Sequence, residues 1–196
     1  MGAVPKRIRE FALGRYCLRR ALSDLQISPQ AILTGTFREP ILPFGITASI
    51  THCDTVCAAA ALLKSTGINS LGIDCEENTP LDSNLIAHIC TEQEIAFYRK
   101  HIQPNQQTPD ILRQEGLWAK TVFSIKESYY KAYYQITGSF LDFLEAEVVL
   151  DTKNQSASVK PKIQSKVNAA HLPNLFGTGY YKMTDSAIFS AISICP

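Results

Sequence analysis

The first half of the chain combines one helical pattern with several short strand patterns. Apolar residues recur at helical spacing from Lys6 to Leu25, which predicts an amphipathic helix. A segment rich in glycine and proline at residues 35–45 has no periodicity and predicts a loop. The segments Ile46–Ile50 and Leu71–Glu76 predict strands, whereas the apolar run Val56–Leu63 fits either a buried strand or a short helix.

The second half opens with helical patterns and ends in strand patterns. Thr91 and Glu94 have the spacing of a capping box, which predicts a helix through about Lys100, and a longer helix is predicted over Leu117–Tyr134. The remaining strand patterns lie at Phe143–Asp151, at Ser156–Lys160 and, as a final pair, within Gly177–Ile194. Because helices and strands follow one another without regular βαβ alternation, the predicted fold class is α+β.

The composition is that of an ordinary globular protein. The 196 residues are 45% hydrophobic and 19% charged, with a formal net charge of +1. This balance provides no overall field to hold nucleic acid, so no nucleic-acid partner is expected. No apolar run reaches the about 20 residues that span a bilayer, and no apolar segment follows the basic N-terminus as in a signal peptide. We therefore expect a cytoplasmic protein without stable membrane insertion.

The six cysteines are irregularly spaced. They stand at positions 17, 53, 57, 75, 90 and 195, without a C-x-x-C pair or a zinc-finger arrangement of histidines. His52 beside Cys53 is an alternative metal-ligand pair. Reduced, mostly buried thiols in a cytosolic protein are the simpler interpretation.

Two carboxylates in the stretch LGIDCE suggest a metal site. Asp74 and Glu76 would point to the same face of a strand, where their charges repel unless a cation lies between them. Mg²⁺ is usually held by one or two carboxylates together with substrate phosphates. A solvated strand end before a turn is the alternative explanation for the same residues.

The stretch FSIKESYYKA, residues 123–132, has both a local and a chemical interpretation. Locally, Ser124 and Glu127 have the spacing of a capping box, and Glu127 with Lys131 forms a favourable i,i+4 pair. Chemically, Glu127 would supply a third carboxylate to the ion, while Lys126 and Lys131 would offer positive charge to phosphate oxygens. Further candidates for phosphate binding are Arg15, Arg19, Arg38 and His52, each of which, taken singly, is more often a surface residue. Together they predict a metal-plus-phosphate site assembled from both halves of the chain.

These stretches resemble a known family, the 4′-phosphopantetheinyl transferases, and within it the group of enterobactin synthetase component D, which activates siderophore and peptide synthetases. The similar stretches are FALGRYCLRRAL (11–22), REPILPFG (38–45) running into SITHC (49–53), LGIDCE (71–76), FSIKESYYKA (123–132) and FLDFLEAEV (140–148). The combination of G-I-D-x-E with F-S-x-K-E-S-x-x-K is the most specific part of the resemblance.

The resemblance implies a fold and an activity. The fold would be a pseudo-dimer of two similar α+β halves, at residues 1–84 and 85–196, with the active site in the cleft between them. The activity would be that of a holo-[carrier-protein] synthase. Such an enzyme transfers the 4′-phosphopantetheine arm of coenzyme A to a serine of an apo carrier protein and releases 3′,5′-ADP. Mg²⁺ is the expected cofactor, with Mn²⁺ as an alternative, and we expect a cytoplasmic monomer acting in siderophore or other secondary metabolite biosynthesis.

The resemblance also implies a role for each matching residue. Asp74, Glu76 and Glu127 would bind the metal, and Glu127 would act as metal ligand, as general base for the carrier serine, or as both. Lys131 would lie near the pyrophosphate as a catalytic residue. The residues implied to bind coenzyme A are Arg15, Arg19, Arg38, Pro40, Thr51 (where many members have serine), His52, Lys126 and Lys131.

Two alternatives come from other functional classes. One is an inactive module that binds coenzyme A or a carrier protein, against which the intact acids and lysine of the two motifs count. The other is an unrelated Mg²⁺-dependent phosphohydrolase that shares the carboxylates by chance. The serine acceptor would lie on a peptide synthetase, a polyketide synthase or an acyl carrier, and the sequence leaves the choice open.

Overall fold

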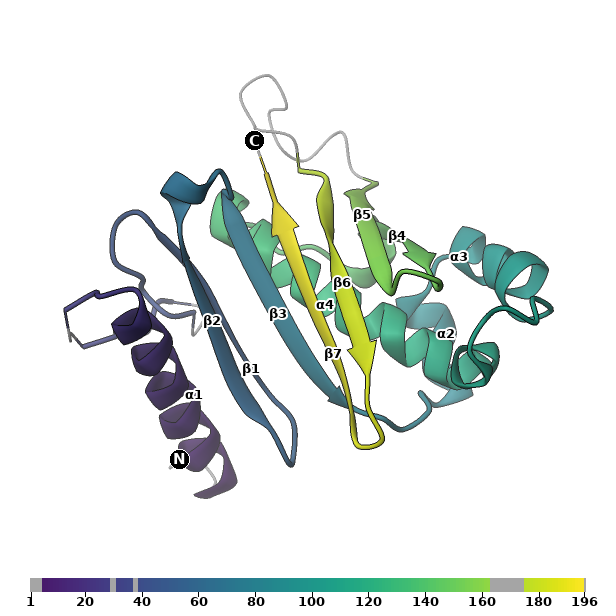
Figure 1. Cartoon of the computed structure of the whole chain (residues 1–196), viewed down its shortest axis with the longest axis horizontal. Coiled ribbons are helices and arrows are strands. Elements are labelled where there is room, and N and C mark those ends of the chain that lie inside the picture. Colours follow the sequence, from purple (N-terminus) through teal and green to yellow (C-terminus); the bar gives the residue numbers. More distant parts are fainter. Residues whose placement is uncertain (1–4, 29–30, 37–38, 163–174, 196) are drawn as a thin grey trace.

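The N-terminal region is a helix packed against a two-stranded hairpin. In this computed structural model, which describes residues 5–28, 31–36, 39–162 and 175–195, helix α1 spans Pro5–Asp24. Strands β1 (Ile46–His52) and β2 (Cys57–Leu63) pair antiparallel, so the apolar run in this region is a strand. Helix α1 lies against this hairpin (Figure 1). Leu18 and Leu22 form its buried side and share a core cluster with Ile46 and Ala48 of β1. The helix predicted at the N-terminus is thereby confirmed.

The C-terminal region contains the larger sheet, whose five described strands run in the order β3-β7-β6-β5-β4. Their bounds are Ser70–Glu77 (β3), Ala146–Asp151 (β4), Ser156–Pro161 (β5), Gly177–Met183 (β6) and Ala187–Ile194 (β7). All neighbouring pairs are antiparallel, and β3 pairs with β7 over its whole length. The α+β class is confirmed. A strand from the first part of the chain is thus an edge of the larger sheet, and a division at residue 84 stays a prediction.

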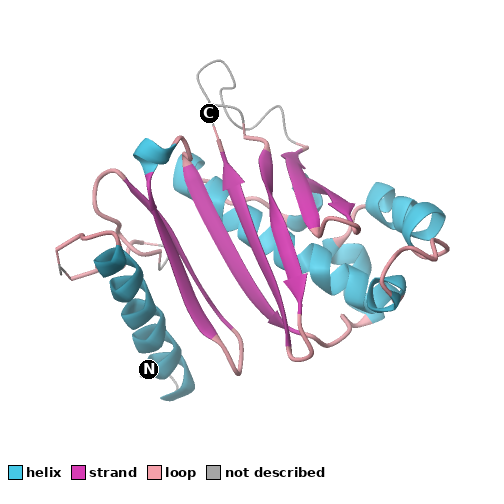
Figure 2. Ribbon diagram, in the orientation of Figure 1, coloured by secondary structure: helices cyan, strands magenta, loops and turns pink. Residues whose placement is uncertain are grey.

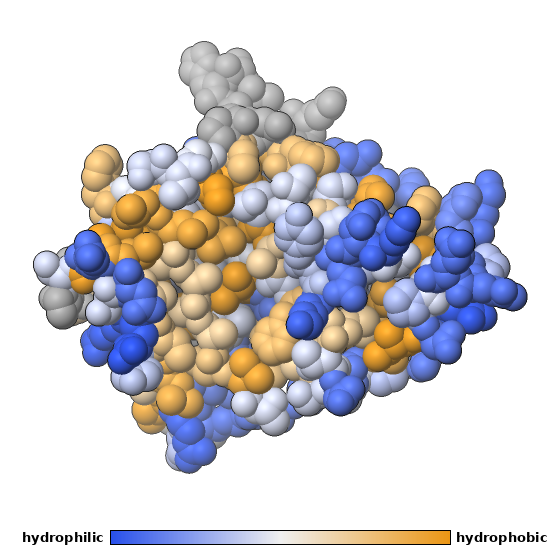
Figure 3. Space-filling view, in the orientation of Figure 1, coloured by the Kyte–Doolittle hydropathy of each residue, from blue (hydrophilic) through white to orange (hydrophobic). Residues whose placement is uncertain are grey.

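Helix α4 covers one face of the larger sheet (Figures 1 and 2). The helices are α2 (Ser83–Ile89), α3 (Glu92–Phe97) and α4 (Glu115–Thr137), with short helical turns at Lys64–Thr66, Tyr98–Ile102, Asp110–Arg113 and Phe143–Glu145. On the opposite face, apolar side chains gather over the strands and hydrophilic ones toward the two sides (Figure 3). The aromatic and aliphatic side chains between α4 and the sheet, Trp118, Ile125 and Tyr129 among them, form the main core.

Small residues let α4 approach the sheet closely. A Cβ atom on Gly72 would lie 1.8 Å from the carbonyl oxygen of Ser128, so β3 requires glycine at this position. Ser124 and Ser128 each share a hydrogen bond with the Ser190 hydroxyl of β7, at 2.8 and 2.7 Å. Ser124 therefore lies inside α4, which begins at Glu115, and the predicted capping box at Ser124 is wrong.

Side-chain hydroxyls, rather than strand pairing, join β1 to β3. The backbone N–H groups of Leu71, Ile73 and Cys75 on the outer edge of β3 donate hydrogen bonds to hydroxyl oxygens of β1. The acceptors are Thr47, Ser49 and Thr51, at 2.8, 3.0 and 2.9 Å. We call this set the hydroxyl ladder. The hydroxyl ladder satisfies backbone N–H groups on an edge strand that would otherwise be open to pairing with another chain.

Two local predictions in the second half need adjustment. The capping box of Thr91 and Glu94 is confirmed, but the regular part of α3 ends at Phe97 and continues as a π-helical turn. The strand predicted from Phe143 begins only at Ala146, because the residues before it form a 3-10 turn. Neither change moves the residues of the predicted site.

Candidate active site

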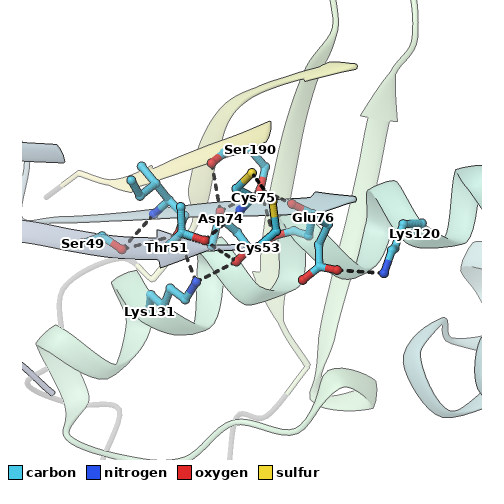
Figure 4. A network of polar contacts seen from close by, with 12 residues as sticks. Ser49, Thr51, Cys53, Asp74, Cys75, Glu76, Lys120, Lys131 and Ser190 are labelled. Atoms are coloured by element: carbon cyan, nitrogen blue, oxygen red, sulfur yellow. Dashed lines mark hydrogen bonds and ion pairs between the residues drawn. The ribbon is translucent and has the colours of Figure 1, made fainter. Parts of the chain in front are cut away.

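Asp74 and Lys131 form the centre of the site. The Lys131 ammonium lies 2.7 Å from Asp74 Oδ1 and also donates to the carbonyl oxygen of Ile73. The Thr51 hydroxyl donates to the same Asp74 oxygen at 3.1 Å (Figure 4). Asp74 is buried, and its other oxygen, Oδ2, has no hydrogen-bond partner among the described residues. Strand β3, strand β1 and helix α4 therefore meet at this one carboxylate.

Glu76 also faces α4, as the alternation along a strand predicts. Its Oε2 lies 2.7 Å from the ammonium of Lys120, which comes from the same helix as Lys131 (Figure 4). At 100° per residue, Lys120, Glu127 and Lys131 fall within about 40° of one another around α4. One helix face thus presents two lysines and a glutamate to the two acids of β3.

Glu127 shares the electrostatic environment of the two β3 acids. Burial raises the pKa of the Glu127 carboxyl, and the charges of Asp74 and Glu76 raise this pKa further, while Lys131 opposes them. The side chain is half-buried and lines a small cavity of about 100 Å³ that also includes Phe143. A carboxylate with a raised pKa is better matched to general-base chemistry near neutral pH than an ordinary one.

The donor set fits a hard divalent cation in chemistry and in charge. Its three carboxylates, Asp74, Glu76 and Glu127, provide only oxygen atoms, and the buried Asp74 Oδ2 is an acceptor without a partner in the described part of the chain. Two lysines of the described ranges, Lys120 and Lys131, face these three negative charges. Among the described residues, however, no group of three or more His, Cys, Asp or Glu side chains is gathered closely enough to hold a metal ion.

A cavity of about 790 Å³ lies beside this centre, large enough for a nucleotide-sized ligand. Its wall contains Arg15 from α1, Pro40 from the following loop, His52 from the end of β1, and Lys131 from α4. These are four of the residues implied to bind coenzyme A, and they come from four separate segments. Lys131 belongs both to this wall and to the ion pair with Asp74.

Arg15 is unusual because it is buried without a carboxylate partner in the described structure. Only 7% of the residue is exposed, and burial lowers the pKa of its guanidinium. Nη2 donates to the Thr34 hydroxyl at 3.2 Å and lies 3.5 Å from the Leu33 carbonyl oxygen, while Nε has no partner among the described residues. The guanidinium also lies 4.9 Å from the ring centroid of Phe11. A buried cation with a spare donor on a cavity wall is suited to an anionic ligand.

Three other described residues implied to bind coenzyme A, Arg19, Thr51 and Lys126, do not line the cavity wall. Arg19 is exposed one turn after Arg15, and Arg38 falls outside the described residues. The Thr51 hydroxyl is used within the protein, because it accepts from Cys75 N–H and donates to Asp74. Thr51 thus positions Asp74, one of the acids that the resemblance implies for the metal site.

The implied role of Lys126 in binding coenzyme A requires a correction. Only 1% of its side chain is exposed, and its ammonium donates to Glu94 Oε2 and to the carbonyl oxygens of Ile89 and Phe143, all within 2.9 Å. All three donors of the ammonium are therefore used inside the protein. Consecutive helical residues point about 100° apart, so Lys126 and Glu127 cannot both face β3. The structure gives Lys126 a structural role and not contact with phosphate.

Comparison with known proteins decides the family. A family model described as the 4′-phosphopantetheinyl transferase superfamily matches residues 70–184, more than half of the chain. A second, the 4′-phosphopantetheinyl transferase N-terminal domain, matches residues 1–62. The chain belongs to the 4′-phosphopantetheinyl transferase superfamily. The two matches meet between β2 and β3, where the N-terminal hairpin ends and the larger sheet begins.

Relatives of known name support this membership in the transferase superfamily. The 4′-phosphopantetheinyl transferase Svp of Streptomyces mobaraensis is 38% identical over 76% of this chain and 57% of its own. Npt of Nocardia iowensis is 30% identical over 97% of this chain and 84% of its own. PptT of Mycobacterium tuberculosis is 31% identical over 76% of this chain and 61% of its own. The chain thus spans under two thirds of the lengths of Svp and PptT.

Lys120 is the main site residue of this transferase-family chain that its sequence did not reveal. Its ammonium is paired with Glu76 and lies 5.5 Å from the ring centroid of Phe123. The sequence did contain a signal for Lys120. It stands eleven residues before Lys131, close to three full helical turns, and so falls on the same face of the helix. It was missed because the motif begins at Phe123.

In the described part of the chain, no helix has both the length and the apolar character needed to cross a membrane.

Proposed function

We propose that the chain transfers the 4′-phosphopantetheine arm of coenzyme A to a serine hydroxyl of an apo carrier protein and releases 3′,5′-ADP. The observation that carries this proposal is the double position of Lys131. It lines the 790 Å³ cavity that also contains Arg15 and His52, and it contacts the buried acid Asp74. A single lysine thus connects a cavity suited to phosphates with a cluster of carboxylates.

In the proposed reaction, the carrier serine attacks the β-phosphorus of coenzyme A, and the bond to the 3′,5′-ADP oxygen breaks. Glu127 accepts the serine proton, a role that its raised pKa supports. Lys131 stabilises charge on the leaving phosphate, and Arg15 and His52 orient the nucleotide within the cavity. Thr51 and Lys131 hold Asp74 in place from two sides.

Asp74, Glu76 and Glu127 are the proposed ligands of Mg²⁺, or of Mn²⁺ in its place. When bound, the ion neutralises charge on the pyrophosphate. The unpartnered Asp74 Oδ2 and the excess of carboxylates over lysines support the assignment. Pro40 on the cavity wall belongs to the proposed coenzyme A site. Arg38, which falls outside the described residues, is assigned to this site from the sequence resemblance alone.

The cellular setting is part of the same proposal. We place the enzyme in the cytoplasm, as a monomer that acts on peptide synthetase, polyketide synthase or acyl carrier domains. The resemblance of its motifs to the group of enterobactin synthetase component D favours siderophore or other secondary metabolite biosynthesis. A panel of apo carriers from these pathways would identify the preferred acceptor.

The decisive experiment is incubation with coenzyme A, Mg²⁺ and an apo carrier domain, followed by intact mass measurement of the carrier. Addition of one phosphopantetheine group to wild-type carrier, and none to a carrier whose acceptor serine is alanine, is the expected result. Coenzyme A binding without transfer to any carrier would instead indicate an inactive binding module. Release of a hydrolysis product without an acceptor would indicate a phosphohydrolase.

A further inference from the structure

Four of the six cysteines gather around the turn between β1 and β2. All six thiols are free, and Cys53 Sγ lies 3.5 Å from Cys75 Sγ, while Cys17 Sγ lies 4.0 Å from Cys57 Sγ. Cys53 and Cys57 are the residues on either side of the turn, so one thiol reaches toward β3 and the other toward α1. The earlier expectation of mostly buried thiols holds for Cys75 and Cys90, whereas the thiols at positions 17, 53 and 57 are half-buried and Cys195 is exposed.

The backbone on both sides of the closer pair is fixed by hydrogen bonds. Cys75 N–H donates to the Thr51 hydroxyl, and Cys53 N–H donates to the carbonyl oxygen of Val56. The turn itself is attached to α1 through an ion pair of 2.6 Å between Lys6 and Asp54. A disulfide has an S–S distance of about 2.05 Å, so the two sulfur atoms need to approach by about 1.5 Å. Rotation of the side chains can provide much of this without separating the strands.

We propose that Cys53 and Cys75 form a dithiol modification site that low-molecular-weight disulfides oxidise to a protein disulfide (Figure 4). Half-buried Cys53 reacts first: its thiolate attacks one sulfur of the small disulfide, forms a mixed disulfide and releases one small thiol. The sulfur of fully buried Cys75 then attacks Cys53 Sγ and displaces the second small thiol. The protein loses two hydrogen atoms, and the oxidant is reduced to two thiols.

The location of this pair links it to the candidate active site, although the proposal does not depend on any activity. Cys75 lies between Asp74 and Glu76 on β3, with its side chain on the opposite face of the strand. Cys53 follows Thr51 and His52 at the end of β1. The disulfide would join covalently the two strands that the hydroxyl ladder joins by hydrogen bonds.

The test uses hydroxyethyl disulfide, a small neutral oxidant, on the reduced full chain, followed by alkylation and cleavage before aspartate residues under non-reducing conditions. This cleavage separates the cysteines, because Asp24, Asp54, Asp74 and Asp82 place Cys53 and Cys75 in the fragments 24–53 and 74–81. The expected product is a crosslink between these two fragments, with the loss of two hydrogen atoms from the intact mass. Dithiothreitol should reverse it.

Variants provide the controls. Cys53→Ala should abolish the crosslink, whereas Cys195→Ala, which removes the exposed thiol near the C-terminus, should leave it unchanged. Far-UV circular dichroism of the reduced variants checks that both remain folded. A product dominated by a Cys53–Cys57 or Cys17–Cys57 crosslink would overturn the proposal, and so would stable mixed disulfides at Cys53 without a crosslink to Cys75. Because the experiment measures only the masses of the chain and its fragments, a negative result would not bear on the proposed transfer reaction.

Discussion

The two regions of the molecule use the same arrangement, a helix on antiparallel strands, with very different packing. Helix α1 packs on the β1–β2 hairpin in a small core cluster, and its Phe11, Leu13 and Tyr16 side chains are exposed. Helix α4 is embedded in a continuous core and approaches β3 so closely that a Cβ atom at Gly72 would not fit. The acids and lysines of the candidate site lie on α4 and β3, whereas the N-terminal region provides Arg15 and His52 to the cavity. The tightly packed region thus carries the proposed chemistry, and the loosely packed region carries the proposed binding surface.

The largest expected effect tests the chemical side of this comparison. Glu127→Gln should lower phosphopantetheine transfer by about 10²–10⁴-fold, the usual contribution of a general base. The same change should stabilise the protein at neutral pH, because burial raises the pKa of the Glu127 carboxyl above its unfolded value. Because the pKa is higher in the folded state, the stability that this group contributes is fully present at pH values below the ordinary glutamate pKa. It is lost as the pH rises through the folded-state pKa.

The measurement is the difference in melting temperature between Glu127→Gln and wild type across pH. The difference should be small in acid and should grow as pH rises above the ordinary glutamate range toward neutrality. Glu115→Gln is the matched control on the same helix, since its carboxylate forms an exposed ion pair with Arg99. A Glu127→Gln protein with normal transfer would remove Glu127 from the catalytic assignment.

The second prediction tests whether the C-terminal region depends on Lys126. Lys126→Met leaves the Glu94 carboxylate buried without its cation and should lower the free energy of unfolding by about 3–5 kcal/mol. Adding Glu94→Gln should recover part of this loss. Lys120→Met, which removes a partly exposed pair on the same helix, should cost about 1 kcal/mol or less. Urea unfolding of the three variants measures these differences, and equal losses for Lys126→Met and Lys120→Met would contradict the structural role of Lys126.

The contrast between Lys126 and Glu127 also marks the limit of prediction from sequence. Hydrophobic periodicity predicted α1, α4 and most strands, because local patterns are enough for a helix or strand with one buried face. The motif placed Asp74 and Lys131 together, but it could not show that Lys126 turns away to meet Glu94. That contact joins residues 32 positions apart, so rules based on neighbouring residues cannot predict it. For the same reason, the pairing of β3 with β7 and the hydroxyl ladder were found only in the structure.

The third prediction concerns the junction between the two regions. Thr51→Val and Thr47→Val each remove one hydroxyl of the ladder and leave a β3 N–H without an acceptor, so each should destabilise the protein by about 1–3 kcal/mol. Only Thr51 also contacts Asp74, whereas Thr47 contacts Gln135. Transfer should therefore fall in Thr51→Val and persist in Thr47→Val at temperatures where both are folded. Equal losses of activity would mean that the ladder positions the site as a unit.

The smallest expected effect tests the binding side of the comparison. We propose that the buried Arg15 guanidinium on the cavity wall binds the 3′-phosphate of coenzyme A. Arg15→Ala should therefore weaken coenzyme A binding by about tenfold, which corresponds to about 1.4 kcal/mol, and should weaken 3′-dephospho-coenzyme A binding less. Arg19→Ala is the matched control, since Arg19 is exposed on the same helix and does not line the cavity. Calorimetry with both ligands measures the two ratios. If Arg15→Ala weakened the binding of both ligands equally, Arg15 would not bind the 3′-phosphate. The N-terminal region would then contribute shape to the cavity rather than charge.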